Sequence, residues 1–319
     1  MFWVRRYSRT WSRIVATAAR GTAGSVPPDQ EKWLFRLPQG FAVMAHPIVE
    51  HMKKSGVKTV GFLGYTDAYG ELWLKEFTKQ GEAAGIKVVA AERFARSDTS
   101  VTPQALKLVS SNPDAMLVVA SGSGAAMPHK GVVERGYKGK IYQTHAAASR
   151  DLVRVGGKDV EGAFVSSGPA VIPEQLPASH PSKALAADFV AKYEKAYGAG
   201  SRNQFGGHAY DAIVVLEKVL PGALKKAKPG TKEFRAAIRD GVETMGRTVV
   251  SHGVLNYTKD NHWGFTTETG VILKVVNGDF SAGNHQVKLD NTQLPSTGVY
   301  FYRIDTEFGS AVKKMVMLD

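Results

Sequence analysis

The sequence predicts an α/β protein with an open, mostly parallel sheet that carries helices on both faces. From Gly40 onward, short apolar and β-branched segments alternate with segments of helical periodicity. Glycines that are typical of helix C-termini follow several helical segments, at Gly56, Gly85 and Gly136. The connections between segments are short. Strands that alternate with helices of about 10 to 15 residues favour parallel pairing.

The expected elements follow one another in a regular order. Apolar residues at helical spacing predict a first helix that begins near Phe41 and ends before Gly56. Predicted strands cover 57–63, 86–91, 115–120, 140–143 and 162–166, and predicted helices cover 71–84, 102–110, 125–135 and 150–155. Because crossovers between parallel strands are right-handed, the strand carboxyl ends meet along one edge of the sheet. Ligands bind at such an edge in open α/β proteins.

The pattern changes after Ile172. A series of prolines predicts that the chain crosses there to a second body, at positions 173, 177 and 181. Three predicted helices follow, at 183–197, 207–220 and 232–243, and then short β segments between 248 and 276 with a turn at Asn277-Gly278. Alternating apolar residues in 291–319 predict a β-hairpin with a turn at Gly309.

Composition excludes several classes of protein. The 319 residues include 43% apolar residues and no cysteine, which excludes disulfides, thiolate nucleophiles and cysteine-ligated metal clusters. No segment approaches the roughly 18 apolar residues of a membrane-spanning helix. The net charge is +12, but the basic residues are mixed with acidic ones and no aromatic residues are interleaved with a basic patch, so we expect no nucleic-acid partner.

The first thirty residues differ in composition from the rest. Five arginines precede the first acidic residue, Asp29, and no apolar run has the length that a secretory signal requires. This composition is typical of a transit peptide or of a poorly ordered leader. We therefore expect residues 1–30 to be a disordered, arginine-rich leader outside the fold.

The sequence offers little support for catalysis. None of the nine histidines has the spacing of a metal site, and no serine lies in a GxSxG motif. The segment 121–126 (SGSGAA) has the first two glycines of a dinucleotide fingerprint but not the third. A tight turn at the start of a helix is the favoured interpretation. A nucleotide- or NAD-linked enzyme that uses Gly122 and Gly124 remains an alternative.

Polar and aromatic residues gather where the predicted strands end. The candidate binding residues are Tyr65, Asp67, Tyr69, Ser121, Ser123, Thr144, His145 and Ala146, together with Glu161, which precedes the last predicted strand. Hydroxyl groups, backbone amides and a carboxylate beside an aromatic wall suit a small zwitterion, because each part of the ligand then has a complementary partner. We expect a binding site without cofactor, metal or catalytic residues.

Several segments in order resemble the branched-chain amino acid class of ABC-transporter solute-binding proteins, which have the type I periplasmic-binding fold. The resemblance covers about Lys32 to Phe280 and rests on KWLFRLP, GVKTVGFLGYTDAYGELWLKEF, ERFARSDTSVTPQ, NPDAMLVVASGSG, ERGYKGKIYQTHAAAS, VGGKDVEG and FGGHAYDA. It implies two α/β lobes around a hinge. Such a protein binds an amino acid or similar carboxylate in the periplasm and delivers it to a membrane permease unaltered.

The resemblance also implies roles for particular residues. Tyr69 matches the tyrosine that lines the space for the ligand side chain, and Glu161 matches the glutamate that pairs with the ligand ammonium. The loop from Thr144 to Ala147 faces the cleft. By the same resemblance, residues 32–38 form a strand that enters the crossover, and 57–171 form most of the second lobe.

The resemblance implies a division into domains and a truncation. Residues 31–56 and 174–280 correspond to a partial first lobe with the hinge, 57–173 to the second lobe and 281–319 to a β-rich tail. Family members carry a longer first-lobe half before this point, so we expect an incomplete first lobe. The segments 294–304 and 313–316 resemble the end of the C-terminal sorting tails of type IX secretion, and a cell-surface protein displayed through this tail is therefore a further alternative.

Overall fold

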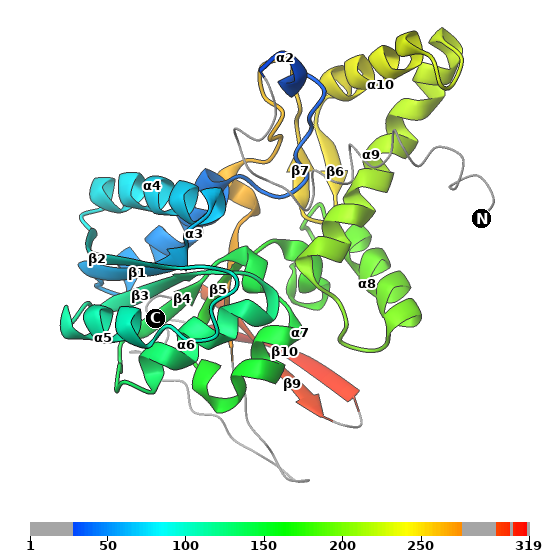
Figure 1. Cartoon of the computed structure of the whole chain (residues 1–319). Helices are drawn as coiled ribbons and strands as arrows, with labels where there is room; N and C mark the ends of the chain where they lie inside the picture. Colours follow the sequence, from blue (N-terminus) through cyan, green and yellow to red (C-terminus); the bar gives the residue numbers. More distant parts are fainter. Residues whose placement is uncertain (1–27, 276–297, 307–308, 318–319) are drawn as a thin grey trace. The chain divides into compact units, whose positions relative to one another are not determined.

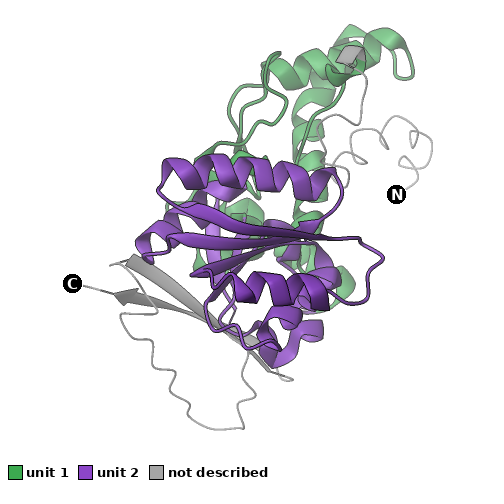
Figure 2. Ribbon diagram, turned by 60° about the vertical axis from the view of Figure 1, so that its left-hand side comes forward, with its two compact units in different colours: residues 1–43, 168–198, 202–269 green, residues 44–167, 199–201, 270–319 purple. Residues whose placement is uncertain are grey.

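The computed structural model describes residues 28–275, 298–306 and 309–317, and these form two compact units (Figure 2). Unit 1 contains the described residues within 1–43, 168–198 and 202–269, and unit 2 contains those within 44–167, 199–201 and 270–319. The sequence placed the boundaries of the second lobe at 57 and 173. In the structure, residues 44–56 lie with unit 2 and residues 168–173 lie with unit 1.

Unit 2 is built on a six-stranded sheet with the order β2-β1-β3-β4-β5-β8 (Figure 1). Its strands are β1 (Thr59–Tyr65), β2 (Lys87–Phe94), β3 (Ala115–Val119), β4 (Lys140–Gln143), β5 (Phe164–Ser167) and β8 (Val271–Lys274). All neighbours pair in parallel except β8, which pairs antiparallel with β5. The open, mostly parallel sheet predicted from the sequence is confirmed.

Helices cover both faces of this sheet. In Figure 1, α3 (Phe41–Lys54) and α4 (Ala68–Ala83) lie on one face, and α5 (Thr102–Ser110), α6 (Ala126–Val133) and α7 (Arg150–Gly156) lie on the other. Because successive strand side chains point to opposite faces, Phe62 of β1 is buried on one side while Leu63 and Tyr65 join a buried cluster on the other. Three short 3-10 turns follow strands or helices, η2 (Gly122–Ala125), η3 (His145–Ala147) and η4 (Gly157–Val160).

Unit 1 consists mainly of helices in its described part. Its elements are α2 (Pro28–Glu31), η5 (Pro169–Val171), η6 (Pro173–Gln175), α8 (Lys183–Tyr197), α9 (Gln204–Lys226), α10 (Lys232–Thr244), β6 (Thr248–Val250), β7 (Gly253–Leu255) and η7 (Thr267–Thr269). Helix α9 is longer than predicted, because Asn203 caps its start by accepting a hydrogen bond from the Gly206 amide at 2.9 Å. It also continues through Pro221 to Lys226.

The strand expected at residues 32–38 is wrong. This segment has no strand conformation, and its hydrogen bonds are single contacts instead of a ladder. The Arg36 amide donates to the carbonyl of His262 at 2.9 Å, and the Tyr257 hydroxyl donates to the Arg36 carbonyl at 2.6 Å. The segment is therefore held in unit 1 by separate anchoring bonds.

The C-terminal hairpin predicted from the sequence is confirmed. Strands β9 (Gly298–Thr306) and β10 (Gly309–Met317) pair antiparallel, in a register that places Thr306 opposite Gly309. The predicted turn at Asn277-Gly278 and all of the predicted leader before Pro28 lie outside the described residues. None of the helices in the described ranges has the length and apolar character needed to cross a membrane.

Two histidines of unit 2 make its stability depend on pH. Burial, together with the nearby lysines 140, 54 and 274, lowers the pKa of His51 from 6.5 to about 4, and burial lowers the pKa of His129 to about 4. In the unfolded chain both rings take up a proton near pH 6.5. The unfolded state therefore binds more protons between pH 6.5 and 4, and the folded state loses stability as the pH falls through this window.

We expect His129→Gln to reduce this loss of stability on acidification. The free energy of unfolding, measured by urea titration at pH 7 and pH 4.5, should differ less between the two pH values for the variant than for the original protein. His46→Gln is the control, because His46 is exposed on α3. An unchanged pH dependence in His129→Gln would contradict the assignment.

Candidate functional site

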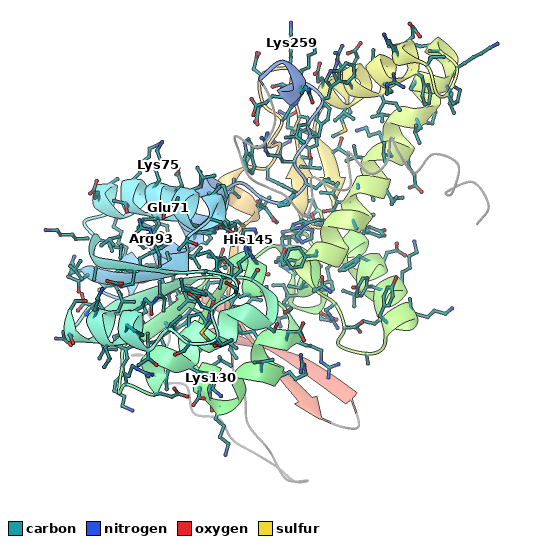
Figure 3. The ribbon with its side chains drawn as sticks, viewed as in Figure 1. Glu71, Lys75, Arg93, Lys130, His145 and Lys259 are labelled. Carbon is teal, nitrogen blue, oxygen red and sulfur yellow. The ribbon has the colours of Figure 1, made fainter. Side chains whose placement is uncertain are left out.

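The loops at the carboxyl ends of β1, β3 and β4 form the candidate site of unit 2. Because these strands are parallel, the residues that follow Tyr65, Val119 and Gln143 lie at the same edge of the sheet. Eight of the nine residues predicted from the sequence lie on this edge. Figure 3 labels one of them, His145, where β4 ends.

A hydrogen bond joins the first turn of α4, which follows β1, to the segment after β4. The hydroxyl of Tyr69 lies 2.8 Å from Oγ1 of Thr144, which in turn donates to the carbonyl of Ala120 at 3.3 Å. Since the Thr144 proton goes to Ala120, the Tyr69 hydroxyl donates to Thr144. Burial raises the pKa of Tyr69, against opposing effects of hydrogen bonds with Thr144 and Trp73, so the phenol stays protonated.

Aromatic rings line the site beside this bond. The rings of Tyr69 and Trp73 meet edge-on with centroids 6.5 Å apart, and the His145 ring lies 6.0 Å from Trp73. Trp73 is fully buried and His145 nearly so, whereas Tyr69 is half-buried. Tyr69 therefore offers an aromatic surface to a ligand, and the buried Trp73 packs against the Tyr69 ring. Ala146 is buried in the η3 turn.

Asp67 has a structural role at this edge. Its carboxylate caps α4, accepting hydrogen bonds from the amides of Tyr69 at 3.0 Å and Gly70 at 3.2 Å. Its other oxygen accepts from Nε of Arg96 at 2.7 Å. Both oxygens of this carboxylate are therefore engaged within the protein.

Arg96 belongs to the site and was missed by the sequence analysis. Its guanidinium lies over the ring of Tyr65, 3.9 Å from the centroid, and Nη1 donates to Oγ of Ser121 at 3.2 Å. The sequence pattern ended the second strand at residue 91, but β2 continues to Phe94. This difference brings Arg96 to the carboxyl edge, two residues after the strand. Arginine so close to a strand end was the signal available in the sequence.

The glycine-containing turn after β3 supports the aromatic residues. Gly122 has a positive φ of 53°, and a Cβ at Gly124 would lie 2.8 Å from the Tyr65 hydroxyl. That hydroxyl accepts a hydrogen bond from the Ser121 amide at 3.3 Å. The two glycines thus allow the turn to close around Tyr65. Ser123 is exposed in the same turn.

Glu161 does not lie with the other predicted residues. It precedes β5, which runs parallel to β4, so it lies at the amino edge of the sheet. The neighbouring Gly162 amide donates to the carbonyl of Val275 at 2.8 Å, just after the antiparallel strand β8. Glu161 is exposed there. Its position on the opposite edge separates it from Tyr69 and Thr144.

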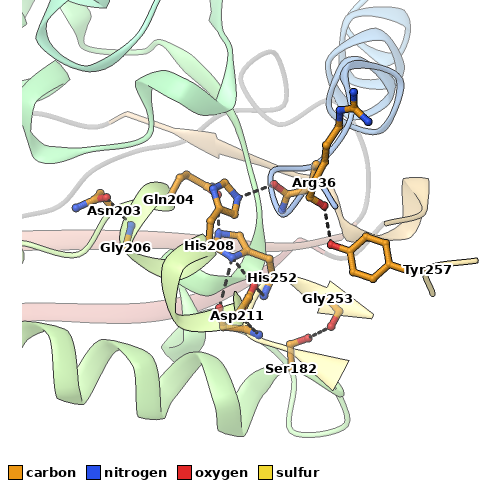
Figure 4. A network of polar contacts seen from close by, with 12 residues as sticks. Arg36, Ser182, Asn203, Gln204, Gly206, His208, Asp211, His252, Gly253 and Tyr257 are labelled. Carbon is orange, nitrogen blue, oxygen red and sulfur yellow. Dashed lines mark hydrogen bonds and ion pairs between the residues drawn. The ribbon is translucent and has the colours of Figure 1, made fainter. Parts of the chain in front are cut away.

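Unit 1 contains a buried polar network (Figure 4). Asp211 of α9 accepts hydrogen bonds from the Ser251 amide at 2.7 Å and from the His252 amide at 3.2 Å, and it lies 2.9 Å from Nδ1 of His252. The other ring nitrogen of His252 lies 2.7 Å from Oε1 of Gln204. Asp211 and His252 are fully buried. The network joins α9 to the connection between β6 and β7.

The network extends to a second histidine. The His208 ring packs against that of His252, with centroids 4.2 Å apart and planes tilted by 31°, and its Nε2 lies 3.1 Å from Oε1 of Gln39. A Cβ at Gly207 would lie 2.3 Å from the His252 ring, so this packing requires glycine. Among the described residues, no group of three or more histidine, aspartate or glutamate side chains has a metal-binding arrangement. We interpret the network as a structural anchor.

We expect Asp211→Ala to destabilise the protein by about 3 to 5 kcal/mol, because it leaves two buried amides and a buried imidazole without their acceptor. Urea unfolding measures this change. Asp240→Ala is the matched control: Asp240 pairs with Arg239 with half of its side chain exposed, and its loss should change stability by about 0.5 kcal/mol or less. Equal effects of the two substitutions would contradict the anchoring role.

Comparisons with known proteins agree with this architecture. Residues 10–279 match the model of a periplasmic binding protein family. An extracellular ligand-binding receptor from Rhodopseudomonas palustris is 50% identical, with a TM-score of 0.77 over 80% of this chain and 71% of that chain. A receptor from Rhodopseudomonas palustris HaA2 is 34% identical, with a TM-score of 0.76 over 86% of this chain and 82% of that chain.

A more distant structure has the same fold. The leucine-binding protein LivK from Thermotoga maritima MSB8 is 21% identical, with a TM-score of 0.63 over 79% of this chain and 67% of that chain. None of the curated proteins compared with the chain matches it. The family and these structural neighbours are ligand-binding proteins rather than enzymes. The chain belongs to the periplasmic binding protein family and has the type I fold of its branched-chain amino acid-binding members.

Proposed function

We propose that this protein binds a small hydrophobic carboxylate, an amino acid or a compound of similar size, and delivers it in the periplasm to the permease of an ABC transporter. Membership of the family supports a binding role. The observation that carries the proposal for this site is the hydrogen bond between Tyr69 and Thr144, which joins two strand ends beside a half-buried aromatic ring. An apolar ligand body lies against such a ring while hydroxyl and amide groups orient its polar end.

The chemistry of the site favours binding without reaction. The Tyr69 and Thr144 hydroxyls are bonded to each other, and Thr144 also donates to the carbonyl of Ala120. The Tyr69 phenol is held in its protonated form by burial, so it is a hydrogen-bond donor and not a base. The turn with Gly122 and Gly124 closes on Tyr65. These features favour a solute-binding protein over the nucleotide-linked enzyme.

Thermal unfolding in the presence of candidate solutes tests the proposal. The solutes are L-leucine, L-phenylalanine, 4-methylpentanoate, 3-phenylpropanoate and NAD. A ligand at 100 times its dissociation constant stabilises the folded protein by about 2.7 kcal/mol, which raises the midpoint by several degrees. We expect at least one of the four carboxylates to raise it and NAD to leave it unchanged. Stabilisation by NAD alone would overturn the proposal in favour of the enzyme.

We expect Tyr69→Phe to weaken carboxylate binding about threefold to tenfold in titration calorimetry. The substitution keeps the ring but removes the hydroxyl that holds the Thr144 loop, and one hydrogen bond contributes about 0.5 to 1.5 kcal/mol. Tyr197→Phe is the matched control, because Tyr197 is 70% exposed on α8 of unit 1. Equal affinities of the Tyr69→Phe and original proteins would show that the ligand does not depend on this contact.

A further inference from the structure

The acidic side chains at the carboxyl edge of unit 2 are already engaged. In the described part of this edge, Asp67 caps α4 and pairs with Arg96 at 2.7 Å. Glu71 pairs with Arg93, beside which it lies in Figure 3. Two further acids also have partners: Asp98 accepts from the Ala95 amide at 2.8 Å, and Asp151 pairs with Arg154 at 2.9 Å.

Because of these pairings, the carboxylates at this edge are poor partners for a ligand ammonium group. A ligand ammonium ion needs a carboxylate that it can approach and neutralise. The Asp67 carboxylate accepts a hydrogen bond from the Tyr69 amide, but two backbone amides, the amino end of α4 and a guanidinium already compensate its charge. Glu161, the other carboxylate expected to serve, lies at the opposite edge of the sheet.

Arg96, unlike these carboxylates, is a charged group that a ligand can approach. Its side chain is 51% exposed, and Nε and Nη1 hold it in place through Asp67 and Ser121. Nη2 has no hydrogen-bond partner among the described residues. A cation–π contact places the guanidinium over the ring of Tyr65. The positive charge of Arg96 also acts on Tyr69. Burial is the largest influence on the pKa of Tyr69 and raises it, whereas Arg96 partly opposes this increase.

We propose that Arg96 is the group with which unit 2 recognises the ligand carboxylate, and that the protein binds hydrophobic carboxylates without an α-ammonium group in preference to the corresponding amino acids. The inference rests on the proposed solute-binding function and narrows its ligand class. The carboxylate accepts hydrogen bonds from the outer nitrogens of the Arg96 guanidinium, and the apolar body lies against Tyr69. An α-ammonium group would be placed beside this guanidinium without a carboxylate of its own.

Titration calorimetry with matched pairs of solutes tests the inference. The pairs are 4-methylpentanoate with L-leucine and 3-phenylpropanoate with L-phenylalanine, which differ only in the ammonium group. We expect the full chain to bind the member without the ammonium group at least tenfold more tightly. Arg96→Gln should weaken binding of that member at least tenfold, and Arg96→Lys should restore part of the affinity because it restores the charge but not the planar group.

Arg235→Gln is the control. Arg235 is exposed on α10 of unit 1 and donates to the Gly230 carbonyl at 3.3 Å, so its replacement releases no carboxylate at the edge of unit 2. Circular dichroism and the unfolding midpoint of each variant show whether it is folded, and the preference of the original protein within each pair is measured independently of any variant.

The outcomes separate the inference from the proposed function. Equal or tighter binding of the amino acids would overturn the inference and leave the solute-binding function in place. Unchanged affinity in folded Arg96→Gln would overturn the role of Arg96. Failure of all four carboxylates to bind would overturn both proposals. Preference for the members without the ammonium group, lost in Arg96→Gln and kept in Arg235→Gln, supports the inference.

Discussion

The candidate site depends on the close return of α4 onto the end of β1. A Cβ at Gly70 would lie 1.8 Å from the carbonyl oxygen of Tyr65, so only glycine allows the helix to begin so near the strand. The Asp67 side chain then reaches the first amides of the helix. Because the helix starts there, Tyr69 lies within hydrogen-bond distance of Thr144 and Trp73 packs beneath it. This backbone approach determines where the rings of Tyr69 and Trp73 lie, since both residues belong to α4.

A chain of contacts also links the charged groups at this edge. Asp67 fixes Arg96, Arg96 lies on Tyr65, and Tyr65 accepts a hydrogen bond from the turn that contains Ser121. A guanidinium held by three neighbours is oriented before any ligand arrives, which lowers the entropic cost of binding. The site therefore differs from one built around an available carboxylate, and this difference decides which solutes it suits.

Local patterns in the sequence were sufficient for most of the fold. Helices α5 and α8 and strand β4 have the predicted bounds, since their apolar periodicity and terminal residues agree. The errors occur where long-range contacts override the pattern. The family resemblance implied a strand at residues 32–38, but single bonds to Tyr257 and His262 hold them in an irregular conformation. Strand β2 extends past residue 91 because its pairing with β1 continues as far as Tyr65 and Phe94.

By itself the sequence determined the α/β class, the order of most elements, the absence of cysteine chemistry, and the strand ends on which Tyr69 and Thr144 lie, because each of these follows from local periodicity or composition. Only the tertiary structure decided which charged groups meet at those ends. The direction of β5 placed Glu161 on the opposite edge, and the pairing of β2 with β1 brought Arg96 onto Tyr65. Contacts between residues far apart in the chain depend on strand order and register, which no local pattern specifies.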